Sequence, residues 1–241
     1  MTELKVSTPK QKTLRLSEHF VSPQGEGPRT GMMTQFVRFA GCNMRCPGWP
    51  CDTQYAIDPA IWRHDSYKRG PDELAQDCIK MYEQTGARVI NLTGGEPFMQ
   101  DHDLLEKFYA RLPTMFALEC FSNGSYLYPD WAIKHVHFVM DWKLPGSGEE
   151  DTAYENRVVN IGQLRSKDVV KFVVCDLADL DKALQTYNAF RKHTAASFWV
   201  GAAWGKFENA DIVEFIKQHK LPWRLNVQVH NYVYKPQERG R

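Results

Sequence analysis

The sequence predicts an α/β protein, built as an incomplete, TIM-like barrel of about six parallel strands. From residue 88 onward, apolar segments of strand length alternate with segments of helix length. Units of this length favour parallel strands joined by right-handed crossovers. Unusual polar clusters follow most of these strands, where parallel α/β proteins place their sites. The helices are few for the number of strands, so we expect an open barrel.

Composition predicts a single domain spanning residues 1–241, which is 43% hydrophobic and long enough for one buried core. The 30 basic and 29 acidic side chains leave a net charge of +1. This balance argues against nucleic acid or an acidic membrane as a partner and favours small molecules. No apolar run reaches membrane-spanning length, and residues 1–12 are polar. We expect a cytoplasmic protein without a membrane segment, whose residues 1–12 are disordered.

Local signals place the elements in order. A first short strand is expected at 13–20, and a second at 35–41 leads into a cysteine-rich loop. A helix is predicted over Pro71–Thr85, because proline and acidic residues suit its first turn and Gly86 ends it. Residues 41–71 and 123–135 show no convincing helical periodicity. Further strands are expected at 88–92, 115–121, 135–140, 169–174, 197–203 and 223–230, with helices at 101–110, 178–193 and 210–220.

Three cysteines lie within ten residues, Cys42, Cys46 and Cys51, spaced Cys-x3-Cys-x4-Cys. Gly48 and two prolines between them favour a loop, and thiolates so close in sequence indicate a soft metal or a cluster. A fourth cysteine is missing from the loop. Zinc remains open, since His64 could complete a Cys3His set. A [4Fe–4S] cluster held by three cysteines would instead leave one iron open to a substrate or cofactor.

Two glycine-rich segments are candidate ligand contacts. Gly94 and Gly95 follow an apolar strand, but no phosphate-loop lysine or serine accompanies them, so a structural turn explains the segment equally well. The loop 22–29 carries two further glycines, which would let the backbone approach a ligand closely.

Taken together and in this order, the motifs resemble those of the radical S-adenosylmethionine enzymes, and among them the 7-carboxy-7-deazaguanine synthase family, over roughly residues 20–236. The segments that carry the resemblance are Gln24-Gly25-Glu26-Gly27, Phe36-Val37-Arg38, Gly41-Cys42-Asn43-Met44-Arg45-Cys46, Cys51-Asp52-Thr53, Thr93-Gly94-Gly95-Glu96-Pro97, Ser122-Asn123-Gly124, Asp141-Trp142-Lys143, Pro145-Gly146-Ser147-Gly148, Lys171-Phe172-Val173 and Gln228-Val229-His230.

The resemblance implies a carbon–nitrogen lyase of queuosine-type 7-deazapurine biosynthesis. Cys42, Cys46 and Cys51 would each bind one iron of a [4Fe–4S] cluster, whose fourth iron would bind S-adenosylmethionine. A 5′-deoxyadenosyl radical would take a hydrogen from C6 of 6-carboxy-5,6,7,8-tetrahydropterin, and rearrangement with loss of ammonia would give 7-carboxy-7-deazaguanine. The resemblance also implies Mg²⁺ at Thr53, an external reductant such as flavodoxin or ferredoxin, a homodimer and an open six-stranded barrel.

It further implies the ligand contacts. The residues expected at S-adenosylmethionine are Pro50, Asp52, Gly94, Gly95, Glu96, Ser122, Asp141, Trp142, Lys143, Val200, Gly201, Ala202 and Ala203. The residues expected at the pterin are Pro23, Gln24, Gly25, Glu26, Arg38, Thr93, Gln228, His230 and Pro236.

The chemistry of several of these residues agrees with such roles. Arg38 offers a planar fork that suits a carboxylate, although surface ion pairs are the commoner fate of arginine. Gln24 and Glu26 can accept hydrogen bonds from a guanidine-like edge. Gln228 and His230 would share one face of the predicted last strand. Lys143 could equally face solvent.

The chain departs from the family pattern in three places. The cysteine loop holds two residues more than the common Cys-x3-Cys-x2-Cys. Asn231 stands where a lysine usually follows the histidine. Pro236 holds the place of a terminal proline whose carboxylate meets the substrate in one branch, but residues 237–241 follow here as an extension.

Two other functions stay open at this point. A radical enzyme that activates a glycyl-radical protein would share the cysteine loop, although a protein substrate needs no pterin-reading groups such as Arg38. A non-catalytic regulator could hold zinc with the same cysteines. Metal analysis of anaerobically purified protein and turnover with the carboxypterin separate these possibilities.

Overall fold

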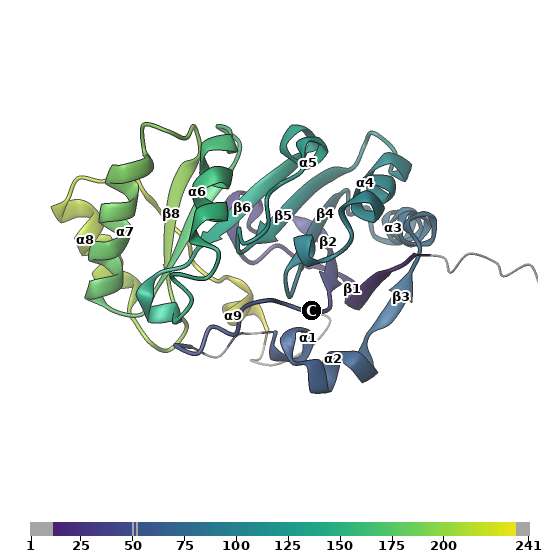
Figure 1. Cartoon of the computed structure of the whole chain (residues 1–241), viewed down its shortest axis with the longest axis horizontal. Helices are drawn as coiled ribbons and strands as arrows, with labels where there is room; N and C mark the ends of the chain where they lie inside the picture. Colours follow the sequence, from purple (N-terminus) through teal and green to yellow (C-terminus); the bar gives the residue numbers. More distant parts are fainter. Residues whose placement is uncertain (1–11, 50, 52, 235–241) are drawn as a thin grey trace, which may run out of the picture.

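The computed structural model of the chain describes residues 12–49, 51 and 53–234. A nine-stranded sheet runs in the order β3-β1-β2-β4-β5-β6-β7-β8-β9. β2 and β4 to β9 pair in parallel, whereas β1 is antiparallel to both of its neighbours. The sheet curves without closing (Figure 1), which confirms the predicted α/β class and the open barrel. Its strands are β1 (Leu14–Pro23), β2 (Met33–Phe39), β3 (Tyr67–Arg69), β4 (Val89–Gly94), β5 (Ala117–Ser122), β6 (Val136–Trp142), β7 (Val169–Val174), β8 (Ser197–Ala202) and β9 (Arg224–Leu225).

The helices form two groups (Figure 1). Helices α3 to α8 lie along one side of the sheet, whereas α1, α2 and α9 lie at its opposite border, beside the cysteine loop. Their bounds are α1 (Gln54–Ile57), α2 (Pro59–Asp65), α3 (Pro71–Thr85), α4 (His102–Arg111), α5 (Asp130–His135), α6 (Tyr154–Gln163), α7 (Leu177–Phe190), α8 (Asn209–Gln218) and α9 (His230–Val233).

The core lies between the sheet and helices α3 to α8. α3 buries Leu74 and Cys78, and α4 buries Leu105 and Phe108, in one apolar cluster with side chains of the sheet. These helices bury one stripe each because their apolar residues recur every three or four positions. A cavity lies on the other side of the sheet, where the parallel strands end.

The predicted elements agree closely where local signals are strong. α3 and β7 have the predicted bounds, and Gly86 ends α3 with a φ of 74°. Residues 41–71 and 123–135 contain the short helices α1, α2 and α5, contrary to expectation, and α6 was also missed. The predicted last strand 223–230 was wrong: pairing stops at Leu225, and His230 begins α9.

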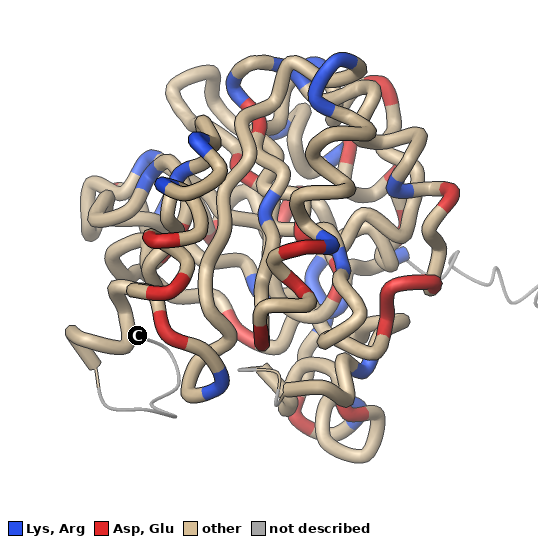
Figure 2. The backbone as a smooth tube through the Cα atoms, turned by 90° about the vertical axis from the view of Figure 1, so that its left-hand side faces the viewer, with Lys and Arg blue, Asp and Glu red and all other residues tan. Residues whose placement is uncertain are grey.

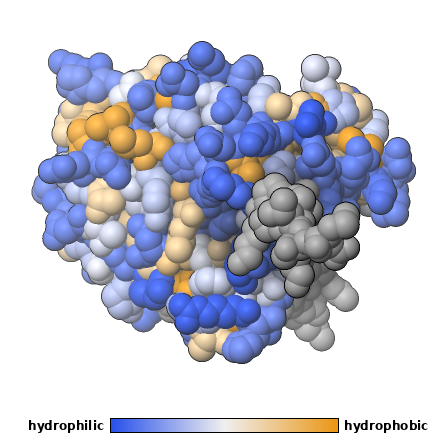
Figure 3. All heavy atoms as spheres, turned by 45° about the vertical axis from the view of Figure 1, so that its right-hand side comes forward, coloured by the Kyte–Doolittle hydropathy of each residue, from blue (hydrophilic) through white to orange (hydrophobic). Residues whose placement is uncertain are grey.

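Charged residues of both signs are mixed along the chain (Figure 2). Hydrophobic residues form separate small areas on the face shown in Figure 3. Within the described residues, no helix combines the length and apolar character needed to cross a membrane.

Candidate active site

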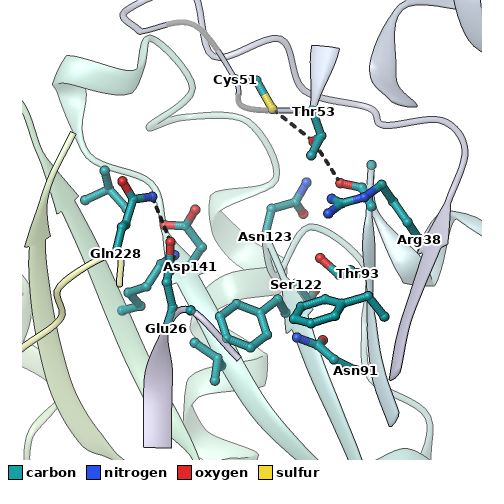
Figure 4. A pocket seen from close by; sticks show the side chains of 18 of the residues that line it. Glu26, Arg38, Cys51, Thr53, Asn91, Thr93, Ser122, Asn123, Asp141 and Gln228 are labelled. Atoms are coloured by element: carbon teal, nitrogen blue, oxygen red, sulfur yellow. Dashed lines mark hydrogen bonds and ion pairs between the residues drawn. The ribbon is translucent and has the colours of Figure 1, made fainter. Parts of the chain in front are cut away.

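A cavity of about 360 Å³ opens at the carboxyl ends of the parallel strands. β2, β4, β5 and β6 contribute residues at or near their ends, and the opposite wall is formed by the loop after β1, by β7 and by the segment before α9. In Figure 4, Arg38, Thr53 and Thr93 lie on one side of the cavity. Glu26, Asp141 and Gln228 lie on the other, with Ser122 and Asn123 between the two groups.

The three thiols of the cysteine loop line one end of this cavity. Cys42, Cys46 and Cys51 are all free, and within the described residues no three His, Cys, Asp or Glu side chains converge on one metal position. A cubane cluster binds each thiolate through a different iron, whereas a zinc ion needs its ligands gathered around one point. Three free thiols that line one end of the same cavity can each bind one iron of such a cluster.

Hydrogen-bond donors surround the sulfur of Cys42. The backbone N–H of Met44 lies 3.4 Å from Sγ, and the side-chain amide of Asn123 lies 3.7 Å from it. Burial raises the pKa of the Cys42 thiol to about 12. The thiol therefore holds its proton unless iron replaces it, and the N–H donors then stabilise the bound thiolate. The donor set fits a cluster with three protein ligands.

The glycine pair at the end of β4, Gly94 and Gly95, allows this segment to pack backbone to backbone against the cysteine loop. Gly95 N–H donates to the Phe39 carbonyl at 2.9 Å, and Glu96 N–H donates to the Gly41 carbonyl at 2.8 Å. A Cβ on Gly95 would lie 1.8 Å from the Gly41 oxygen. These glycines thus fix the cysteine loop against β4, and both line the cavity.

Glu96 is among the residues expected at S-adenosylmethionine. Its side chain is fully buried and does not line the cavity. It accepts hydrogen bonds from Phe98 N–H, Ser122 Oγ and Asn123 N–H, at 2.8 to 3.0 Å. Burial raises its pKa to about 7 despite these donors. Glu96 therefore ties the loop after β4 to the end of β5, which positions Ser122 and Asn123.

Asp141 and Lys143 form a buried pair at the end of β6. Lys143 Nζ lies 2.7 Å from Asp141 Oδ2 and 5.5 Å from the centre of the Trp49 ring. Burial opposes the ammonium charge, but the Asp141 carboxylate holds the pKa of Lys143 above its usual range. The second oxygen of Asp141 is buried without a partner within the described residues.

Glu26 is the centre of the opposite wall. Lys171 Nζ lies 2.8 Å from its Oε2, and Gln228 Nε2 donates to its Oε1 at 2.8 Å. Asn226 Nδ2 donates to Oε2 at 3.3 Å. Burial alone would raise the pKa of Glu26, but the Lys171 ammonium outweighs it and lowers the pKa to about 2. The carboxylate therefore stays charged and fixed.

Arg38 faces the cavity from β2. Its Nε donates to Glu18 Oε2 at 3.1 Å, and its two terminal nitrogens have no hydrogen-bond partner within the described part of the chain. Thr93, its partner in the parallel register of β4, lies beside it (Figure 4). This end of the cavity combines a cation with a hydroxyl, which suits an anionic ligand.

Most of the predicted contacts meet in this one cavity. The predicted residues that line it are Pro23, Gln24, Gly25, Glu26, Arg38, Cys42, Cys46, Cys51, Thr53, Thr93, Gly94, Gly95, Ser122, Asp141, Lys143, Ala203, Gln228 and His230. Three further predicted positions, Pro50, Asp52 and Pro236, lie outside the described residues, as do residues 1–11 and the extension at 237–241.

Four further residues expected at the cofactor are absent from the cavity lining. The Trp142 side chain packs in the core against Tyr154 and Phe190, because strand alternation turns it away from Asp141 and Lys143. Val200 also belongs to the core, and Ala202 packs against it. Gly201 lies against the backbone of Asn226. Of the predicted segment after β8, Ala203 reaches the cavity.

His230 lines the cavity from the start of a helix, not from the end of a strand. Val229 N–H donates to the Gly25 carbonyl at 2.9 Å, which brings the C-terminal segment against the Gln-Gly-Glu-Gly loop. A Cβ on Gly25 would lie 2.2 Å from His230 Nδ1. Glycine at position 25 therefore makes room for the histidine.

The sequence reasoning missed several cavity residues. Trp49 was passed over as part of a loop extension, and Asn123 and Lys171 were seen in motifs but given no role. A charged residue within the apolar strand β7 was the available signal for Lys171. The other missed residues are Phe20, Ser22, Phe36, Met44, Ile57, Asn91, Phe121, Val139, Val173 and Trp204.

An open α/β barrel of mainly parallel strands, with three closely spaced cysteines in the loop after β2, is characteristic of radical S-adenosylmethionine proteins. A family model described as a 4Fe-4S single cluster domain matches residues 23–138. The 7-carboxy-7-deazaguanine synthase of Clostridium acetobutylicum is 31% identical over 229 residues, covering 94% of this chain and 98% of that protein. The chain belongs to the 7-carboxy-7-deazaguanine synthase family.

Further comparisons agree with this assignment. The 7-carboxy-7-deazaguanine synthase of Leptospira interrogans is 30% identical over 250 residues, covering 93% of this chain and 98% of that protein. The crystal structure of QueE from Escherichia coli shares the fold, with a TM-score of 0.65 and 21% identity, over 90% of this chain and 95% of that one. The cofactors that follow from the family are a [4Fe–4S] cluster and S-adenosylmethionine.

Proposed function

We propose that this protein converts 6-carboxy-5,6,7,8-tetrahydropterin to 7-carboxy-7-deazaguanine and ammonia. The observation that carries the proposal is that three cluster-type thiols and the Arg38 cation line one cavity. The proposal also agrees with the activity for which the relatives are named. The conversion needs no external oxidant, because the product and ammonia together contain all the atoms of the substrate.

Cys42, Cys46 and Cys51 would hold the cluster, which with S-adenosylmethionine supplies a hydrogen-abstracting radical when bound. Gly94 and Gly95 present backbone beside the thiols, and Ser122 and Asn123 are fixed there by Glu96. Asp141 lines the cavity next to these residues and would face S-adenosylmethionine. These residues would hold the cofactor and limit its contact with water.

The substrate would lie between Arg38 and Glu26. The terminal nitrogens of Arg38 would bind its carboxylate, and Thr93 would contribute a hydroxyl contact. Glu26 would face the donor edge of the pterin with the oxygen that Gln228 contacts, because Oε2 is already shared by Lys171 and Asn226. Gln24, Gly25 and His230 would complete this wall.

Thr53 is the proposed ligand of Mg²⁺. Its hydroxyl lines the cavity, 3.4 Å from Cys51 Sγ and 3.3 Å from the Gly94 carbonyl. One neutral hydroxyl is a weak site for a hard cation, so substrate oxygens and water would supply the remaining ligands. A cytoplasmic location, a flavodoxin or ferredoxin as reductant and a homodimer complete the proposal.

The test is turnover of the reconstituted protein under anaerobic, reducing conditions with S-adenosylmethionine and the carboxypterin. Formation of 7-carboxy-7-deazaguanine, with iron and sulfide bound in a ratio suited to one [4Fe–4S] cluster, supports the proposal. Absence of product from the loaded protein contradicts it. Zinc as the native metal of anaerobically purified material would favour the regulator instead.

A further inference from the structure

We propose that Glu18 is a positioning residue, which holds the Arg38 guanidinium so that its two terminal nitrogens face a substrate carboxylate. The inference rests on the function proposed above and adds a determinant of substrate specificity to it. Glu18 belongs to β1, outside every motif that identified the family. Three features of the structure support the role: a bulge in β1, a shielded ion pair and a tyrosine that binds the same carboxylate oxygen.

The bulge turns Glu18 toward the cavity. Leu16 pairs with Phe39 of β2, and Glu18 pairs with the next residue back, Arg38, so Ser17 is the extra residue on β1. Before the bulge, Leu14 and Leu16 lie in the core on the helix side of the sheet. After it, Phe20 and Ser22 line the cavity. Regular alternation would place all the even-numbered residues on one face.

Because of the bulge, the residue that follows Glu18 lies on the helix side of the sheet, away from Arg38. His19 follows Glu18, points to the helix side and lies 3.3 Å from Gln35 Oε1 and 3.8 Å from Cys78 Sγ. Glu18 thus meets Arg38 directly across the antiparallel pair. Bulges commonly re-aim side chains beside active sites, and this one matches a carboxylate to the arginine.

The contact uses one edge of the guanidinium. Arg38 Nε donates to Glu18 Oε2 at 3.1 Å, and the two side chains are 14% and 17% exposed. Because Nε is occupied, a ligand carboxylate would meet the two terminal nitrogens in a bidentate contact. Shielding from water makes this pair stronger than an exposed surface pair.

Tyr55 holds the Glu18 carboxylate through a second hydrogen bond. Its hydroxyl donates to Glu18 Oε2 at 2.7 Å, so one oxygen joins β1, β2 and α1. The rings of Phe20 and Tyr55 lie 5.8 and 6.0 Å from the guanidinium carbon of Arg38. The guanidinium is therefore confined in position and in rotation, which lowers the ordering cost of binding a carboxylate.

The experiment compares Glu18→Ala, Glu18→Gln and Tyr55→Phe with the wild-type holoenzyme. Glu214→Ala, which removes a surface ion pair with Lys217, is the control. The readouts are KM for the carboxypterin, KM for S-adenosylmethionine and the inhibition constant of tetrahydropterin, which lacks the carboxylate. If Glu18 positions Arg38, Glu18→Ala raises KM for the carboxypterin about 10-fold. The other two constants and the Glu214→Ala variant stay within about twofold of wild type.

Glu18→Gln keeps an oxygen that accepts from Nε, and Tyr55→Phe keeps the carboxylate, so both should raise the same KM by less than Glu18→Ala does. They also keep the test valid if Glu18→Ala fails to fold. An unchanged KM for the carboxypterin in all three variants overturns the inference. An equal rise in the tetrahydropterin constant also overturns it, because a general distortion would act on both molecules. Inactive wild-type holoenzyme would instead contradict the proposed function.

Discussion

The Glu26 carboxylate and the Lys171 ammonium lie 2.8 Å apart, although they are separated by 145 residues in the chain. Their side chains are 13% and 12% exposed. The pair joins the loop after β1 to β7, and Gln228 adds the C-terminal segment through the same carboxylate. One charged pair therefore holds together three parts of the chain that form the proposed substrate wall.

Replacing Lys171 by Met should destabilise the protein by about 3 kcal/mol, because the Glu26 charge would remain buried without its cation. Adding Glu26→Gln should restore much of that loss, since the double variant buries no unpaired charge. Urea unfolding of the anaerobic holoprotein measures both effects. The double variant should nevertheless bind the carboxypterin poorly. A wild-type KM for the carboxypterin in the double variant would show that the Glu26 carboxylate has no role in substrate binding.

Replacing Arg38 by Ala should raise KM for the carboxypterin by about 100-fold, corresponding to the loss of a charge-assisted contact worth about 3 kcal/mol. Cleavage of S-adenosylmethionine should remain measurable, since Arg38 is assigned to the pterin and not to the cofactor. Arg38→Lys should recover only part of the loss, because lysine lacks the planar fork. The assigned role would be contradicted by an equal loss of cleavage and pterin binding in Arg38→Ala.

Replacing Trp49 by Ala should weaken S-adenosylmethionine binding by about 1 kcal/mol, roughly fivefold in KM. The ring lines the cavity and lies over Lys143, so its removal exposes the Asp141–Lys143 pair to water. Trp49→Phe keeps an aromatic face and should lose less. KM for the carboxypterin serves as the internal control. If that KM changes more than KM for S-adenosylmethionine, Trp49 contacts the pterin and not the cofactor.

Replacing Gly95 by Ala should disrupt the cysteine loop. The new Cβ would lie 1.8 Å from the Gly41 oxygen, and neither backbone segment can move without breaking the hydrogen bonds between them. Gly162→Ala is the matched control, because a Cβ there meets no atom within 4 Å and alanine favours the helix. We expect Gly95→Ala to lose cluster content, measured as iron per protein, while Gly162→Ala keeps it. Equal iron content in the two variants would argue against the steric explanation.

The contribution of Glu119 to stability should fall as pH rises from about 5 to about 7. Burial raises the pKa of Glu119 from 4.5 to about 7, so the folded protein binds this proton more tightly than the unfolded chain. The resulting stabilisation is complete below about pH 4.5 and disappears as pH rises through about 7. Glu96 acts in the same direction, since burial raises its pKa to about 7 as well.

Glu119→Gln tests this assignment. The amide cannot ionise, but its oxygen still accepts from Gln24, as Glu119 does at 2.8 Å. Urea midpoints measured between about pH 5 and pH 8 should fall less steeply in the variant than in wild type. Parallel curves for the two proteins would assign the pH dependence to other groups.

The sequence predicted those parts of the candidate site whose chemistry follows from residue type and local spacing. The three cysteines, the glycine pair before Glu96 and the arginine of β2 are recognisable from residue type and spacing, and the structure brings them to one cavity. Trp142 and His230 show the limit of such reasoning. A motif places a residue in the chain, but strand alternation decides the side on which Trp142 lies, and the helix that begins at His230 depends on contacts with Gly25.

The sequence by itself determined the alternation of strands and helices, the bounds of α3 and β7 and the thiol chemistry of the cysteine loop, because each depends on residues close together in the chain. Only the tertiary structure decided that Lys171 neutralises Glu26 and that Ser17 is the extra residue which aligns Glu18 with Arg38. Strand register and ion pairing arise from contacts between distant segments. A one-residue shift moves every following side chain to the other face, and no local pattern in β1 specifies that shift.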